Sequence, residues 1–503
     1  MTLISASTLY DHYKCPHRVW RDKYGPQDEK SQETNPFVEL LWEKGAQHED
    51  KVIQKIGSFV DISQGTLNER FQKTLKAMTA GMDLIYQGVV MDEEMLGIPD
   101  LLRKSDDGTY LPIDIKSGMG YEGADEDEGE EGKPKKHYAL QLCLYADLLI
   151  RLGFAREKQG SIIDIHGNEV IYPLSASMGI RTPQTYWNFY EETKKEVTRL
   201  LANQATNKPA MSKSLCGMCP WYMSCKKWCD DHDDLTNLFY LGRSSRDRIN
   251  EELGIETIAD FAEIDVSQIL ERKKKEKGFL SGLGDKSLPK YKRRAEILAK
   301  TRKPVLYKPL TLPNVAYEIF FDIEGDPTQD FVYMHGIYER SPGGERYIDF
   351  TATEISPEAE KEIWSRFWSY IETLPERQFA IYYYAPYEKT IYRKLQKRYP
   401  QVISVEKLEA FFENPNVIDL YNQVIQSHTD WPLGSYSLKE IAVYLGFKWR
   451  DETPSGALSI QWFNEYLKTN DPKILQRIRE YNEDDCKATM VVKDGVMALM
   501  RAA

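Results

Sequence analysis

The sequence predicts an α/β protein of several domains, and three observations lead to this fold class. The chain has 503 residues, whereas one domain averages about 150 residues. Apolar strand-like runs alternate with helical patterns at both ends of the chain, as in α/β domains. The stretch between them has a helical pattern and is rich in Lys and Arg. We expect three domains, at residues 1–232, 233–310 and 311–503.

Composition excludes several classes of protein. With 41% hydrophobic and 29% charged residues, the chain is typical of soluble globular proteins. Its longest apolar region, residues 139–155, is interrupted by Asp147 and Arg151, so we expect no membrane span. The N-terminal MTLISAS has no features of a signal peptide. We therefore expect a cytoplasmic protein, and its seven cysteines, an odd number, favour metal binding over a disulfide framework.

Charge is strongly segregated along the chain. The net charge is −12, but residues 272–303 hold thirteen Lys or Arg against three acids, a local charge of +10. Residues 122–131 hold seven acids, and such a run is typical of a solvated loop. The basic segment, rather than the total charge, therefore indicates the partner, and it favours nucleic acid.

The N-terminal region mixes helices and short strands. A helix is expected over Ser7–Tyr24, with Ser7 or Thr8 as its N-cap. The remaining expected elements are strands at Gln87–Val90, Leu96–Arg103 and Tyr110–Ile115, and helices at Tyr138–Leu152 and Pro183–Asn203. The turn-forming Ser-Asp-Asp-Gly at residues 105–108 joins the last two strands into a hairpin.

Two acids on this hairpin form the first candidate site. Asp114 and Lys116 lie two residues apart and share one face of their strand, where Asp100 from the other arm can meet them. Hydrolysis of a phosphodiester needs oxygen ligands for Mg²⁺ and a nearby cation. Asp100, Asp114, the Ile115 carbonyl and Lys116 would supply both. The alternative is an exposed hairpin with scattered charges.

Neighbouring motifs strengthen the first interpretation. The order Gly45–Glu49, Gly97–Asp100, Asp114–Lys116 and Gln141–Tyr145 resembles the RecB-type branch of the PD-(D/E)XK nucleases. The resemblance covers about residues 1–232 and implies a restriction-endonuclease-like core that cleaves DNA with Mg²⁺ or Mn²⁺. The implied roles are metal binding by His48, Asp100, Asp114 and Ile115, and catalysis by Lys116, Gln141 and Tyr145.

Four cysteines form a second candidate site. Cys216, Cys219 and Cys225 are so closely spaced that metal binding is expected, with Cys229 or the distant Cys15 as fourth ligand. Buried thiols are the alternative, and spacing alone does not separate zinc from iron–sulfur. An N-terminal Cys-Pro followed by CxxCPxxxxC resembles the iron–sulfur subclass of RecB-like exonucleases, which includes CRISPR spacer-acquisition and AddB-type repair proteins. The resemblance implies a [4Fe–4S] cluster on Cys15, Cys216, Cys219 and Cys225, with Cys229 spare. Cys143 is expected in the core.

The C-terminal region holds a third candidate site. A strand at Ala316–Ile323, a helix at Glu358–Thr373 and a strand at Gln378–Tyr384 are expected. Asp322 and Glu324 share one strand face, and Tyr481 and Asp485 lie one helical turn apart. Together they could hold two Mg²⁺ ions and orient a water. The alternative is a capped strand end and a polar helix.

This third set resembles the DEDD exonucleases of the RNase H-like superfamily, in the tyrosine-bearing DnaQ-like variant. Asp322 and Glu324 match the first motif, and Tyr481 and Asp485 the third. The second motif departs from the family pattern, because Glu388 stands where an aspartate is usual. The resemblance implies metal binding by Asp322, Glu324, Glu388 and Asp485, and catalysis by Tyr481. Asp419 is a further candidate acid.

The middle segment contains pieces that resemble helix–hairpin–helix modules, Leu253–Phe261 and Gly282–Gly284. Such modules bind the phosphate backbone without reading sequence. Lys290, Lys292, Arg293 and Arg294 are the expected DNA contacts. A solvated basic linker is the alternative.

These observations predict a metal-dependent nuclease with two sites that acts on DNA, with single-stranded DNA as the expected substrate. An RNA-directed 3′–5′ exonuclease and a nucleic-acid-binding scaffold with an inactive second site are the alternatives. The sequence contains no GxxxxGK[ST] motif, so any helicase would be a separate partner.

Overall fold

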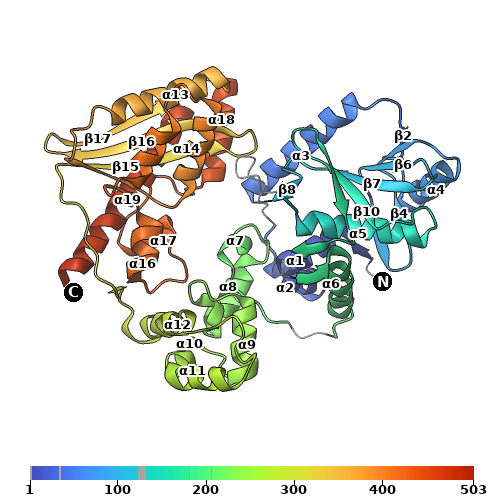
Figure 1. Ribbon diagram of the computed structural model, residues 1–503, viewed down its shortest axis with the longest axis horizontal. Helices are drawn as coiled ribbons and strands as arrows, with labels where there is room; N and C mark the ends of the chain where they lie inside the picture. Colours follow the sequence, from blue (N-terminus) through green and yellow to red (C-terminus); the bar gives the residue numbers. More distant parts are fainter. Residues whose placement is uncertain (1–2, 33–34, 123–131, 180–181, 205–206, 503) are drawn as a thin grey trace. The chain divides into compact units, whose positions relative to one another are not determined.

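The computed structural model describes residues 3–32, 35–122, 132–179, 182–204 and 207–502. The chain forms two compact units, one of residues 1–209 and 214–224, the other of residues 210–213 and 225–503 (Figure 1). The basic middle segment belongs to the second unit. Most of the predicted acidic loop, residues 123–131, lies outside the described residues.

The first unit surrounds a mixed sheet. Its helices are α1 (Ala6–Lys14), α2 (Pro16–Tyr24), α3 (Pro36–Lys55), α4 (Leu67–Thr79), α5 (Lys136–Arg151) and α6 (Tyr186–Leu201). Its strands are β1 (Ile4–Ser5), β2 (Val60–Asp61), β3 (Leu84–Tyr86), β4 (Val90–Met91), β5 (Met95–Gly97), β6 (Leu101–Lys104), β7 (Tyr110–Ile115), β8 (Tyr121–Glu122), β9 (Lys133–Pro134), β10 (Gln159–Ile163), β11 (Glu169–Pro173), β12 (Ser177–Gly179) and β13 (Thr182–Thr185).

The single helix expected over Ser7–Tyr24 is two helices. Cys15 has extended backbone because Pro16 follows it, and the residue before a proline is disfavoured in the helical region. Ser5, rather than Ser7 or Thr8, caps α1 with a capping box that Thr8 completes. The expected strand at Leu96–Arg103 is likewise split into β5 and β6, with Pro99 in the break.

Strand β7 lies in the middle of a six-stranded sheet of order β11-β10-β7-β6-β3-β2. It pairs with β6 in antiparallel and with β10 in parallel orientation. One face of the sheet packs on α5, whose residues Leu140–Leu144 are almost all buried, and the other packs on Val52 and Ile53 of α3 and on Ile56, which follows this helix. Cys143 lies in the core, as predicted.

The chain passes between the two units within α7 (Lys213–Cys216) and α8 (Tyr222–Asp231). The second unit then continues with a helical part made of α9 (Arg243–Leu253), α10 (Ile258–Phe261), α11 (Val266–Lys275) and α12 (Ser287–Glu296). Helices α9 to α12 enclose a small core that includes Ile249, Phe261 and Leu288. Arg294 of α12 is 1% exposed and donates from Nε to Asp430 Oδ1 (2.7 Å). This buried ion pair connects the helical part to the C-terminal part of the same unit.

The C-terminal part is a five-stranded sheet of order β17-β16-β15-β18-β19 with helices on both faces (Figure 1). Its strands are β15 (Tyr317–Asp326), β16 (Phe331–Ser341), β17 (Gly344–Thr351), β18 (Phe379–Tyr383) and β19 (Val417–Asp419), and β14 (Val305–Leu306) pairs with β20 (Thr429–Asp430). Its helices are α13 (Pro357–Ile371), α14 (Tyr387–Arg398), α15 (Val405–Glu413), α16 (Gln426–His428), α17 (Leu438–Tyr444), α18 (Gly456–Thr469) and α19 (Pro472–Ala502).

The alternation along β15 decides which side chains face the site. Phe321 packs on Phe367 of α13, whereas Asp322 faces Asn482 of α19. The β16–β17 hairpin lies between the predicted strands at Ala316–Ile323 and Gln378–Tyr384. It was not expected from the sequence, although Pro-Gly-Gly at residues 342–344 is a turn signal.

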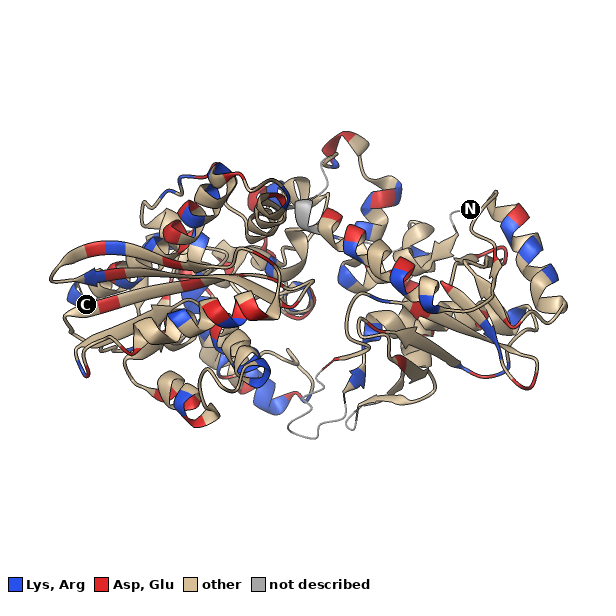
Figure 2. Cartoon of the chain, turned by 90° about the horizontal axis from the view of Figure 1, so that it is seen from above, with Lys and Arg blue, Asp and Glu red and all other residues tan. Residues whose placement is uncertain are grey.

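Acidic and basic residues are interspersed over both units (Figure 2). Within the described ranges, every helix is too short or too polar to cross a bilayer.

Two candidate metal sites

The first candidate site lies where β7 ends. Asp114 is 1% exposed and forms an ion pair with Lys116. Asp100 accepts a hydrogen bond from the Ile115 N–H to Oδ2 (2.7 Å). Burial, and next the charge of Asp114, raise the pKa of Asp100 well above its ordinary value. The structure thus brings both acids and the lysine of the hairpin together in one buried group.

Two further residues belong to this group, although neither was selected from the sequence. Gln87 Nε2 donates to Glu49 Oε1 (2.8 Å) and to Asp100 Oδ1 (3.0 Å). Gln87 has φ of 54°, a left-handed conformation that is uncommon for a residue other than glycine. Glu49 follows His48 in the same motif, so the sequence did contain a signal for it. Nothing in the sequence pointed to Gln87.

The other predicted residues of this region, His48, Gln141 and Tyr145, form hydrogen bonds with groups other than the two acids. His48 Nε2 lies 3.0 Å from the Asp164 carbonyl oxygen, so this nitrogen is occupied by the backbone. Gln141 Nε2 donates to the Tyr145 hydroxyl (2.8 Å), and burial followed by the charge of Asp114 raises the pKa of Tyr145. A Cβ on Gly97 would lie 2.7 Å from Tyr145 Cδ1, so glycine is needed for this approach.

The second candidate site is a triad of carboxylates. One oxygen from each of Asp322, Glu324 and Asp485 lies within 4.8 Å of the other two, and in the described part of the chain no other three His, Cys, Asp or Glu residues come this close. Burial raises the pKa of all three, and repulsion from other members of the triad adds to the shift of Asp322 and of Glu324, whose pKa rises to about 8. Oxygen ligands in this arrangement suit a hard divalent cation.

An asparagine and a glycine hold the triad in place. Asn482 of α19 donates from Nδ2 to Asp322 Oδ2 (2.8 Å) and accepts at Oδ1 from the Tyr347 hydroxyl (2.9 Å). Gly336 is the partner of Asp322 in the β15–β16 pairing. A Cβ on Gly336 would lie 1.5 Å from Asn482 Oδ1, so α19 can approach only because this residue is glycine.

The Tyr481 hydroxyl lies between the ammonium group of Lys439 and the carboxylate triad. It accepts a hydrogen bond from Lys439 Nζ (3.2 Å) and is hydrogen-bonded to Asp485. Trp449 Nε1 donates to Asp485 Oδ1 (2.7 Å), which fixes this carboxylate from the other side. Lys439, on α17, was not identified from the sequence.

Glu388 occupies the first turn of α14. It is 3% exposed, and its Oε2 has no hydrogen-bond partner among the described residues. Burial raises its pKa well above the ordinary value, and its charge in turn raises the pKa of Asp322. A buried, unpartnered carboxylate oxygen facing other acids is the arrangement that a bound cation would relieve. Asp419 instead accepts a hydrogen bond from Asn422 Nδ2 (2.8 Å) and stabilises the turn that follows it.

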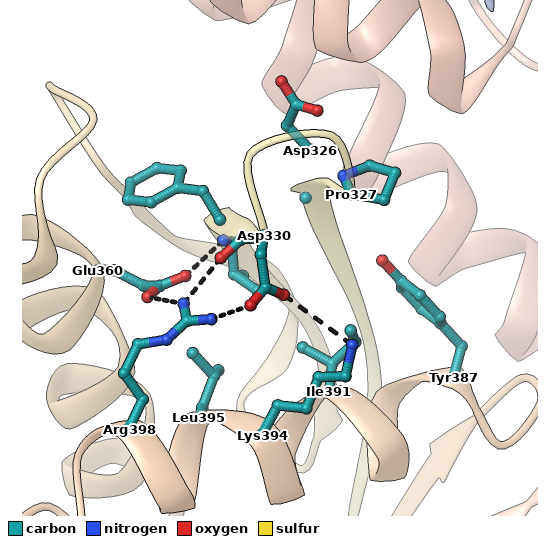
Figure 3. Close-up of a pocket in the computed structure, with 12 residues that line it drawn as sticks. Asp326, Pro327, Asp330, Glu360, Tyr387, Ile391, Lys394, Leu395 and Arg398 are labelled. Atoms are coloured by element: carbon teal, nitrogen blue, oxygen red, sulfur yellow. Dashed lines mark hydrogen bonds and ion pairs between the residues drawn. The ribbon is translucent and has the colours of Figure 1, made fainter. Parts of the chain in front are cut away.

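A pocket of about 130 Å³ is lined by Gly325, the residue after Glu324, and Figure 3 shows the side chains around it. Tyr387 lines the pocket, and burial followed by the charges of Glu324 and Asp322 raises its pKa to about 12. Figure 3 shows Arg398 held between Glu360 and Asp330 on the opposite wall. Lys394, 58% exposed at its side chain, is the more accessible cation of the lining.

The cysteines are only partly grouped. Burial raises the pKa of Cys219, and smaller contributions come from Cys15 and Cys216, so each of these two lies near Cys219. No three cysteine sulfurs of the described residues lie within 4.8 Å of one another. Thiolates on one zinc ion with bonds of about 2.3 Å would lie closer than that, so the described cysteines do not form a closed zinc site. Burial and Asp234 raise the pKa of Cys229 to about 12, which disfavours it as a thiolate ligand.

Three of the four basic residues predicted to contact DNA form ion pairs inside the protein. Arg293 and Arg294 bind Asp430, and Lys292 pairs with Glu296. Arg294 is buried and therefore has a structural role, which corrects its selection as a phosphate contact. The exposed basic side chains of this segment are others: Arg272, Lys274, Lys275, Lys277, Lys286, Lys300, Arg302 and Lys303.

Two known families match the N-terminal and the C-terminal part of the chain separately. Residues 9–226 match the model of the PD-(D/E)XK nuclease superfamily, and residues 319–497 match that of the RNase_H superfamily. No curated protein and no solved structure is significantly similar to the chain. The protein is therefore a mixed α/β chain with a PD-(D/E)XK-type N-terminal region, a helical middle and an RNase H-like C-terminal domain. Both matches support a hydrolase that acts on nucleic acids.

Proposed function

We propose that the protein is a Mg²⁺- or Mn²⁺-dependent nuclease that degrades single-stranded DNA through two separate sites. The observation that carries the proposal is the close triad of Asp322, Glu324 and Asp485, in which burial and then repulsion raise the pKa of Asp322 and Glu324, and a divalent cation would relieve this repulsion. Asp100 and Asp114 supply a second acidic pair beside Lys116.

The chain's own residues have distinct tasks in the C-terminal site. The triad and Glu388 would hold the cations, which when bound activate a water and neutralise charge on the phosphate. Tyr481 accepts a hydrogen bond from Lys439, so its own proton is directed elsewhere, toward Asp485 or an attacking water. The pocket beside Tyr387 offers apolar space for a terminal base next to the acids, which supports an exonuclease mode.

In the N-terminal site, Asp100, Asp114 and the Ile115 carbonyl would hold the cation. Lys116 is placed to meet the charge that develops on the phosphate. Glu49, which Gln87 ties to Asp100, is an additional candidate ligand. His48 would need to contribute its Nδ1, because Nε2 is directed to a carbonyl.

The deciding experiment is cleavage of end-labelled single-stranded DNA, compared with RNA of the same sequence, by wild type, Asp114→Asn, Asp322→Asn and the double variant. We expect Mg²⁺-dependent cleavage of DNA that each single variant reduces and the double variant abolishes. Asp114→Asn should remove the larger share, because Glu388 adds a methylene to the metal shell of the other site and small misplacements cost about 10²-fold. Preferential cleavage of RNA, or binding without cleavage, would establish one of the alternatives instead.

The proposed second cofactor is a [4Fe–4S] cluster on Cys15, Cys216, Cys219 and Cys225. The donor chemistry supports it, since four thiolates suit such a cluster and Cys15 and Cys216 lie near Cys219. Protein purified without oxygen should be brown and contain iron. Cys225→Ser should lose the colour, while Cys229→Ser should keep it. Colourless protein with stoichiometric zinc would overturn the assignment.

A further inference from the structure

A group of aromatic rings and lysines lies at the surface of the first unit, and we name it the aromatic–cation patch. Its members come from α1 and from the start of α5: Tyr10, Tyr13, Lys14, Lys135, His137 and Tyr138. The His137 ring centroid lies 4.4 Å from that of Tyr138, 5.8 Å from that of Tyr10 and 6.2 Å from that of Tyr13. The rings therefore form one continuous aromatic surface.

Cations border this surface on both sides. Lys14 Nζ lies 5.4 Å from the Tyr10 ring centroid and 5.5 Å from that of Tyr13. Lys135 Nζ lies 5.1 Å from the Tyr138 ring. Burial, and next Lys14, Lys135 and Lys116, lower the pKa of His137 to about 4, so at neutral pH it is an uncharged flat ring among lysines. Among the described acids, Glu122 acts on Tyr13 and Lys135, and Asp11 acts on Tyr10.

The patch reaches the N-terminal candidate site. Lys116 Nζ, the cation paired with Asp114, lies 5.8 Å from the Tyr138 ring centroid. A Cβ on Gly118 would lie 3.1 Å from the Tyr138 hydroxyl, so the chain that leaves β7 passes close to this ring. Catalytic lysine and aromatic surface are thus neighbours.

The exposure of its tyrosines distinguishes the patch from a hydrophobic core. Tyr10 is 41% and Tyr13 is 38% exposed, although both are large aromatic side chains. Aromatic faces stack on any base, and lysines attract the phosphate backbone, which is the combination that binds single-stranded nucleic acid without sequence preference. Duplex DNA keeps its base faces stacked inside and cannot use such a surface.

We propose that the aromatic–cation patch binds the unpaired bases of single-stranded DNA next to the scissile phosphate at the N-terminal site. The proposal deepens the proposed function and rests on it for the site of cleavage. Tyr10 and Tyr13 stack on bases, Lys14 and Lys135 face the backbone, and Tyr138 leads the strand to Lys116.

The test uses full-length protein with Asp322→Asn, so that cleavage comes from the N-terminal site alone. In this background, Tyr13→Leu is compared with Tyr13→Phe, which keeps the ring, and with Tyr24→Leu, which removes a tyrosine of equal exposure (38%) outside the patch. The substrates are a single-stranded 20-mer and bis(p-nitrophenyl) phosphate, which is too small to reach the patch. Tyr13→Leu should raise the KM ratio of 20-mer to small ester about tenfold, within the range for one lost base–aromatic stack. Tyr13→Phe and Tyr24→Leu should leave the ratio unchanged.

A second measurement is independent of cleavage. A 20-mer containing 5-iodouracil is irradiated with the protein in EDTA, and crosslinked peptides are mapped. Crosslinks to Tyr10 or Tyr13 that unlabelled single-stranded DNA displaces, but duplex DNA does not, are expected. Crosslinks only outside the patch, equal displacement by duplex, or an unchanged KM ratio would overturn the proposal. Crosslinking in the patch without any hydrolysis would retain the binding surface and refute the nuclease function of this site.

Discussion

The carboxylate triad should make the metal-free second unit less stable as pH rises, and Glu324→Gln should remove much of this effect. The pKa of Glu324 in the folded protein is about 8, against an ordinary value of 4.5. Between these values the folded carboxyl keeps a proton that the unfolded one has lost. Unfolding therefore releases a proton, and the free energy of unfolding falls with increasing pH until both forms are ionised above about 8.

The size of the effect follows from the same two values. A difference of about 3.5 in pKa corresponds to about 5 kcal/mol at 1.36 kcal/mol per unit. Glu324 shares its repulsion with Asp322 and Asp485, so a coupled group cannot release the full amount. We expect Glu324→Gln to gain about 2 kcal/mol at pH 9, or roughly 4–8 °C in Tm. The amide keeps the shape of the side chain and can still accept from Tyr333 and Ser459.

Calorimetry in EDTA at pH 6 and pH 9 measures the gain, and repetition with Mg²⁺ measures its cause. Mg²⁺ should raise the Tm of wild type more than that of Glu324→Gln, because a ligand stabilises only the state that binds it. Glu465→Gln, an exposed carboxyl of α18, is the control and should change neither value. A Tm for Glu324→Gln at pH 9 in EDTA that is equal to or below that of wild type would refute the reasoning, as would equal stabilisation of both proteins by Mg²⁺.

Three further substitutions test the positioning of the sites. Gly336→Ala should displace Asn482 and lower Mg²⁺ affinity at the C-terminal site at least tenfold, measured by calorimetric titration in an Asp114→Asn background. Arg294→Met should lower the free energy of unfolding by up to about 3 kcal/mol, because the buried Asp430 would keep only the partly exposed Arg293 as an ion-pair partner; loss of DNA binding without loss of stability would show that Arg294 contacts DNA after all. Lys439→Met should lower kcat of the C-terminal site about 10-fold or more with little change in KM, and an unchanged kcat would exclude a role in orienting the tyrosine beside it.

Elements with long, regular patterns were predictable from the sequence. Strand β7 has the expected bounds, Tyr110–Ile115, and α5 and α13 lie within two residues of theirs at each end. Each has a continuous apolar face that only one layer of the fold can bury. The split at Cys15 was also readable, because Pro16 restricts the residue before it. The β16–β17 hairpin was missed although its turn carries two glycines and a proline.

The residues that position the acids were not predictable. Gln87, Asn482 and Lys439 belong to no motif, and each reaches its partner from an element distant in sequence. Only the packed structure shows that Gly336 is glycine because Asn482 lies against it. Arg294 was selected as a DNA contact for the related reason that composition does not reveal which arginines are already paired with an acid, as Arg294 is with Asp430.

In each site, one amide side chain donates hydrogen bonds to the carboxylates. Gln87 bridges Glu49 and Asp100, and Asn482 donates to Asp322 with a longer contact to Glu324 (3.5 Å). A lysine or arginine in either place would hold the acids as well, but it would neutralise them and compete with a cation for the same oxygens. An amide donor fixes the carboxylates in place and leaves their charge uncompensated. The unrelieved repulsion, visible in the raised pKa of Asp100 and of Asp322, is then available to drive metal binding.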